Sequence, residues 1–140
     1  MPQSSPTETE AAILDANAAF YSAFTAGDFA AMRALWAEHA PLACIHPMSP
    51  VLVGRDAVLE SWKQILREPP PFELRCDRPV AHVLEGFAVV TCYEGNGSQP
   101  AHLAATNVFV LENGRWRMIH HQAGPLAEPI PKPVDRTTMN

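Results

Sequence analysis

Apolar residues at the start of the chain recur at helical spacing. Thr7 and Glu10 form a capping-box pattern, in which a hydroxyl is followed three residues later by a carboxylate. Phe20 and Phe24 then lie one turn apart on an apolar stripe that begins near the cap. This pattern predicts a first helix that begins at about residue 7.

Two glycines mark helix boundaries in the first half of the chain. Gly27 is placed to end the first helix in a left-handed conformation, and Asp28 to cap a second helix over about 29–38. Gly54 precedes a third apolar helical pattern over about 55–67. We therefore expect three helices in the first half of the chain.

Alternation of period two replaces the helical pattern in the second half. It predicts strands over 72–84, 87–94, 102–111 and 115–123, the first of them bulged near Asp77–Pro79, after a short strand over 42–46. Asn113-Gly114 is a strong signal for a tight hairpin. Helices first and a β-meander last indicate an α+β fold. We expect a cone-shaped fold, in which three N-terminal helices pack on a strongly curved mixed or antiparallel β-sheet that encloses a pocket.

Composition narrows the class of protein. The chain has 140 residues, of which 47% are apolar and 18% charged, a balance that suits one globular domain. Its net charge of -5 makes nucleic acid a poor partner, and no apolar run is long enough to span a membrane. Three widely spaced cysteines do not form a disulfide framework, which favours the reducing cytoplasm.

Prolines mark the expected domain limits. They concentrate in the first six residues, in the last sixteen residues and in the segment Pro69–Pro71, which ends the helical half of the chain. We expect a disordered tail over 1–6, one domain over 7–126 and a proline-rich C-terminal tail over 127–140.

The order of elements and four phrases resemble the SnoaL-like branch of the nuclear transport factor 2-like superfamily. The phrases are FYSAFTAGDFAAMRALW at 20–36, CIHP at 44–47, GRDAVLESWKQIL at 54–66 and TNVFVLENGRWRMIHHQAGP at 106–125. The resemblance covers about residues 8–126 and implies a deep apolar cavity between helices and sheet. It is less informative about function, because this fold hosts isomerases, cyclases, dehydratases, hydrolases and non-catalytic binders.

Comparison with ketosteroid isomerase, a member of that superfamily, implies where catalytic groups would lie. His46-Pro47 corresponds to the isomerase's Asp-Pro, Phe20 and the adjacent Tyr21 to its tyrosine, and Thr106 to its second aspartate. None of the three catalytic groups is retained, so steroid isomerase activity is not expected.

Two histidines are the candidate catalytic residues. On strand 42–46, Cys44 and His46 share one face, and strict alternation on the last strand places His120 and Gln122 on the face of Trp116 and Met118. Imidazole suits proton transfer near neutral pH. The structural alternative is that His46 bonds a backbone carbonyl and that His120 is a core histidine with a satisfied hydrogen bond.

Other residues are expected to line the pocket. The ligand-binding candidates are Phe20, Tyr21, Trp36, Cys44, Trp62, Thr106 and Gln122. The simpler interpretation of Cys44 is a small buried apolar residue and not a nucleophile. No metal is expected, because no H-x-x-x-H or C-x-x-C spacing occurs, and no Gly-rich fingerprint points to an organic cofactor.

Two hypotheses of different class follow. The first is a small-molecule-binding SnoaL-like protein, an acid/base enzyme of the isomerase, dehydratase or cyclase type that needs no cofactor and acts on a small hydrophobic ligand. The second is a non-catalytic module that binds a ligand or serves as a dimerising partner. A homodimer through the outer sheet face is expected in either case. A cavity filled by side chains would favour the second hypothesis.

Overall fold

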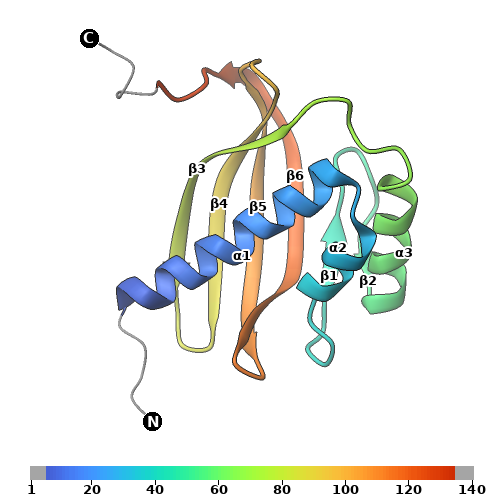
Figure 1. Ribbon diagram of the computed structural model, residues 1–140, viewed down its shortest axis with the longest axis vertical. Helices are drawn as coiled ribbons and strands as arrows, with labels where there is room; N and C mark the ends of the chain where they lie inside the picture. The colour runs from blue at the N-terminus through green and yellow to red at the C-terminus, as the bar shows by residue number, and fades with distance from the viewer. Residues whose placement is uncertain (1–5, 135–140) are drawn as a thin grey trace.

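The computed structural model describes residues 6–134 and contains three helices on one face of an open sheet (Figure 1). The elements in chain order are α1 (Pro6–Ala26), α2 (Phe29–Leu35), β1 (Ala43–Ile45), β2 (Leu52–Val53), α3 (Arg55–Ile65), β3 (Leu74–Val83), β4 (Phe87–Asn96), β5 (Ala101–Glu112) and β6 (Arg115–Ile130). The α+β class predicted from the sequence is confirmed.

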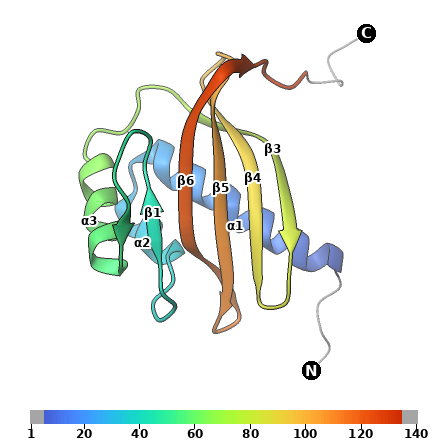
Figure 2. The ribbon, with the colours of Figure 1, turned by 180° about the vertical axis from the view of Figure 1, so that it is seen from behind.

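Six strands form one mixed sheet in the order β2-β1-β6-β5-β4-β3. The four long strands form an antiparallel meander, and β1 joins β6 in parallel. Figure 2 shows the sheet from the side that carries no helix, with α1 crossing behind the long strands. The sheet therefore has an inner face against the helices and an outer face away from them.

Local signals placed most of the element boundaries. Gly27 adopts a φ of 65° after α1, and the Asp28 carboxylate accepts a 3.0 Å hydrogen bond from the Ala31 N–H. Asn113 and Gly114 both have positive φ, as a tight hairpin turn requires. The expected bulge of β3 lies between Asp77 and Val80.

The largest differences from the predicted boundaries lie at the ends of α2 and β6. The second helix ends at Leu35 because the next residues pair with β6: Trp36 bridges Met118, and the Ala37 N–H bonds the Met118 carbonyl at 2.9 Å. The last strand runs to Ile130, which pairs with Ala101, and so continues past the expected end at residue 123.

The core lies between the inner face and the helices. Its largest fully buried apolar side chains are Ile13, Phe20, Met32, Trp36, Trp62, Phe109 and Met118. The Phe20 ring meets the Trp62 ring edge to face at a centroid distance of 5.3 Å. Aromatic side chains therefore fill the space in which the sequence predicted a pocket.

Candidate functional site

A buried carboxyl group lies on the inner face of β4. Alternation along this strand places Cys92 and Glu94 on the face of Val90, and only 3% of Glu94 is exposed. The Tyr21 hydroxyl of α1 donates a 2.8 Å hydrogen bond to Glu94 Oε2. No Lys or Arg in the described part of the chain pairs with this group. Burial raises the pKa of Glu94, and the Tyr21 hydrogen bond opposes that rise only in part.

Asn107 of β5 connects this carboxyl group to a histidine. Its Nδ2 donates to Asn17 Oδ1 at 2.8 Å and to the Tyr21 hydroxyl at 3.2 Å. Its Oδ1 lies 2.6 Å from His121 Nδ1. A row of polar side chains therefore runs through the interior from Glu94 to His121.

His121 is held neutral. Because Asn107 Oδ1 can only accept, the proton of the His121 ring lies on Nδ1, and Nε2 keeps its lone pair. Burial, with smaller contributions from the nearby His46 and His120 charges, lowers the pKa of His121 to about 3. His121 is thus an uncharged imidazole inside the domain.

His46 lies at the end of β1 and is only partly buried. The Ser61 hydroxyl of α3 donates to the Val58 carbonyl at 2.6 Å, so it can only accept from His46 Nε2, 3.0 Å away. His46 Nδ1 therefore carries the lone pair, and burial lowers the pKa of this side chain. Cys44 Sγ lies 3.7 Å from His46 Nε2, but burial raises its own pKa to about 12, which makes it a poor nucleophile.

Trp62 joins the two histidines. Its ring lies at a centroid distance of 4.8 Å from His46 and 5.9 Å from His121. Trp62 is fully buried, and its Nε1 has no hydrogen-bond partner among residues 6–134. Buried donors are nearly always paired, so this N–H, like that of Trp36, is an exception.

The structure separates the predicted site residues into two groups. Phe20, Tyr21, Trp36, Cys44 and Trp62 are buried between the helices and the inner face, and His46 contacts Cys44 and Trp62. His120, Thr106 and Gln122 lie on the outer face, so their expected position in the interior is wrong.

A bulge in β6 explains this correction. Val108 pairs with His120 whereas Phe109 pairs with Met118, so Ile119 is an extra residue in β6. The bulge shifts the alternation by one position. His121, and not His120, therefore follows Met118 on the inner face, and His120 Nδ1 lies 3.1 Å from the Ala43 carbonyl.

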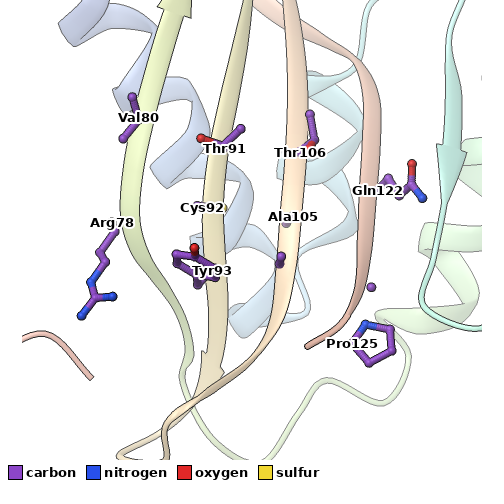
Figure 3. Close-up of a pocket in the computed structure, with 11 residues that line it drawn as sticks. Arg78, Val80, Thr91, Cys92, Tyr93, Ala105, Thr106, Gln122 and Pro125 are labelled. Carbon is purple, nitrogen blue, oxygen red and sulfur yellow. The ribbon is translucent and has the colours of Figure 1, made fainter. Parts of the chain in front are cut away.

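The outer face carries a hollow of about 690 Å³ lined by residues of four strands. Figure 3 shows Thr91, Thr106 and Gln122 along it, with α1 on the far side of the sheet. Thr106 pairs with both Thr91 and Gln122 across the strands. Thr106 and Gln122, two of the predicted ligand-binding residues, therefore line this outer hollow. The predicted aromatic residues are buried on the opposite face of the sheet.

Sequence reasoning missed four members of the interior row: Asn17, Glu94, Asn107 and His121. Alternation was the available signal for two of them, because Glu94 follows Val90 and Cys92 on one face and Asn107 lies between the buried Ala105 and Phe109. Within residues 6–134, no three His, Cys, Asp or Glu side chains gather into a metal-binding group. No helix in that range is long and apolar enough to cross a membrane.

Three helices on one face of an open mixed sheet define a domain of the nuclear transport factor 2-like type. The SnoaL-like domain family model matches residues 13–128, and the chain belongs to this family. The family comprises small-molecule-binding and isomerase- or dehydratase-type proteins.

Individual relatives differ in role. A proposed dehydratase of the nuclear transport factor 2-like family from Streptomyces avermitilis is 28% identical with a TM-score of 0.78, over 89% of this chain and 100% of that one. A proposed association domain of a calcium/calmodulin-dependent protein kinase type II from Thiobacillus denitrificans is 33% identical with a TM-score of 0.67, over 79% and 92%. The F-box protein SKIP8 of Arabidopsis thaliana is 28% identical over 82% of this chain, which spans about half, 50%, of that relative.

Proposed function

We propose that the protein binds a small, mainly apolar molecule with a carbonyl or hydroxyl group and acts on it by cofactor-independent acid/base chemistry. The reaction would be of the isomerase, dehydratase or cyclase type. The observation that carries the proposal is the ring contact of His46, whose unprotonated Nδ1 lies 4.0 Å from the Cys44 sulfur, with Trp62, whose buried N–H is unpaired. A base beside an available donor is the minimum that proton abstraction next to a carbonyl needs.

Each group has a defined role in this chemistry. The Trp62 N–H would bond the ligand oxygen, and His46 Nδ1 would accept a proton from the adjacent carbon. Ser61 positions His46 by accepting from Nε2. The low pKa of His46 keeps it uncharged and ready to accept a proton at neutral pH. The Streptomyces relative described as a proposed dehydratase supports this class of reaction.

Hydrogen–deuterium exchange tests the proposal without knowledge of the natural substrate. The protein is incubated in D2O with cyclohex-2-enone and related cyclic ketones, and deuterium uptake next to the carbonyl is followed by proton NMR. We expect wild type and the control His82→Asn, which changes an exposed histidine, to exceed the buffer rate. We expect His46→Asn to return to the buffer rate. Equal rates for wild type and His46→Asn with every ketone would contradict the proposal.

A non-catalytic partner module is the second candidate. Phe20, Trp36 and Trp62 fill the interior, so a ligand can bind only if some of these side chains move. The Thiobacillus relative described as a proposed kinase association domain supports an assembly role. Absence of exchange with every ketone, together with a stable homodimer, would favour this candidate.

A further inference from the structure

Two cysteine thiols meet on the inner face of the sheet. Cys76 of β3 pairs with Glu94 of β4, and Cys92 lies two residues before Glu94 on the same face of β4. The two residues are therefore diagonal neighbours, and each thiol shifts the pKa of the other. Both are free cysteines.

Helix α1 supplies a polar contact to each sulfur. Asn17 Nδ2 donates to Cys76 Sγ at 3.4 Å, and the Tyr21 hydroxyl lies 3.2 Å from Cys92 Sγ. The neighbouring Cys76 lowers the pKa of Cys92, whereas the neighbouring Cys92 and burial raise the pKa of Cys76. Cys92 is thus the more acidic thiol of the two.

The backbone at this pair has room to adjust. The bulge of β3 begins one residue after Cys76 and places Arg78 and Pro79 opposite Cys92. Diagonal cysteines must approach slightly to form a disulfide, and an irregular stretch of strand accommodates such a shift more easily than a regular ladder.

Cys76 is also the more accessible thiol of the two. It is half-buried and lines a hollow of about 610 Å³ between α1 and β3, together with Tyr21 and Thr25. Cys44, by contrast, is fully buried, and burial raises its pKa to about 12. A small oxidant that enters the hollow would therefore meet Cys76, the accessible member of the pair, and not Cys44.

We propose that Cys76 and Cys92 form a redox-active dithiol that closes to an intramolecular disulfide when a hydroperoxide enters the hollow between α1 and β3. The Cys76 sulfur, which lines the hollow, attacks one peroxide oxygen, the O–O bond breaks, the thiol proton passes to the leaving oxygen, and Cys76 sulfenic acid and water (an alcohol from an organic peroxide) are formed. The Cys92 thiol then attacks the sulfenic sulfur, which forms the S–S bond and releases water. Two thiols are oxidised and one peroxide is reduced.

The full chain treated with hydrogen peroxide tests this inference. We expect free thiols to fall from three to one, the mass to fall by two hydrogen atoms, and peptide mapping to join Cys76 to Cys92. Dithiothreitol should restore all three thiols. The control Cys44→Ser should form the same disulfide at the same rate, and Cys76→Ser and Cys76→Ala should not form it.

Three results would overturn the inference. They are modification of Cys44 as fast as the pair, a disulfide between chains in place of one within the chain, and sulfinic acid formation in wild type with no S–S bond. Cys76 is only partly buried, so its variants are expected to fold; far-UV circular dichroism of each variant before oxidation checks this. None of these readouts depends on the ketone-exchange activity.

Discussion

The hydroxyl of Tyr21 donates a 2.8 Å hydrogen bond to Glu94 across the interface between α1 and β4, and it is the only side chain in residues 6–134 that hydrogen-bonds this buried carboxyl group. Tyr21 also accepts from Asn107. One hydroxyl thus connects the first helix to two central strands. The first prediction follows from this single neutral donor to an interior carboxyl group.

Tyr21→Phe should lower the free energy of unfolding by about 1–3 kcal/mol, because it leaves the Glu94 carboxyl group buried without a donor. Glu94→Gln should cost less, since the amide oxygen still accepts from Tyr21 and no carboxyl group remains buried at this position. Urea denaturation of both variants at pH 7 measures the difference. A larger loss for Glu94→Gln than for Tyr21→Phe would contradict this account.

Acid should destabilise the protein through His121. Its pKa falls from 6.5 to about 3 on folding, so the unfolded chain binds more protons below pH 6.5. The His121 contribution is fully present above that pH and falls by about 1.4 kcal/mol per pH unit as the pH drops from about 6 to about 4. His46 acts in the same direction, and Glu94, whose pKa is raised, acts in the opposite one.

Urea denaturation across this pH range isolates the His121 term. The stability of His121→Gln should depend less steeply on pH than that of wild type, whatever the absolute stability of the variant. His82→Gln, which changes an exposed histidine, should keep the wild-type slope. Equal slopes for wild type and His121→Gln would show that His121 does not govern acid unfolding.

His46→Asn should separate function from stability. If His46 serves a ligand, the variant should melt within a few degrees of wild type, because His46 is partly exposed and its bonded partner Ser61 keeps its own bond to Val58. Ketone exchange should be lost at the same time. A loss of roughly 1–3 kcal/mol with exchange intact would instead assign His46 a structural role.

The outer face should support a two-fold homodimer. Val108 and Val110 alternate with the buried Asn107 and Phe109, so they lie on the face that no helix covers. Sedimentation equilibrium should give a dimer at micromolar concentration, and Val108→Glu should shift it toward monomer. A wild-type monomer under these conditions would contradict the prediction.

Sequence alone determined the features that depend on neighbouring residues. Gly27 and Asp28 separate the first two helices, Asn113-Gly114 sets the last hairpin, and the bulge near Asp77–Pro79 lies where expected, because caps, turns and Pro-containing bulges follow from local chemistry. The same phrases carried the resemblance that the family match confirms.

Tertiary pairing decided which side chains reach the interior. The extra residue at Ile119 arises from the pairing of β6 with β5, and it exchanges His120 for His121 on the inner face. Glu94 and Asn107 gain a role only through contacts with Tyr21 and His121, each distant in the sequence. A register shift of one residue moves every later side chain of a strand to the other face of the sheet. Hydrogen bonds between distant segments, and not the alternation within one strand, therefore decide which residues belong to the candidate site.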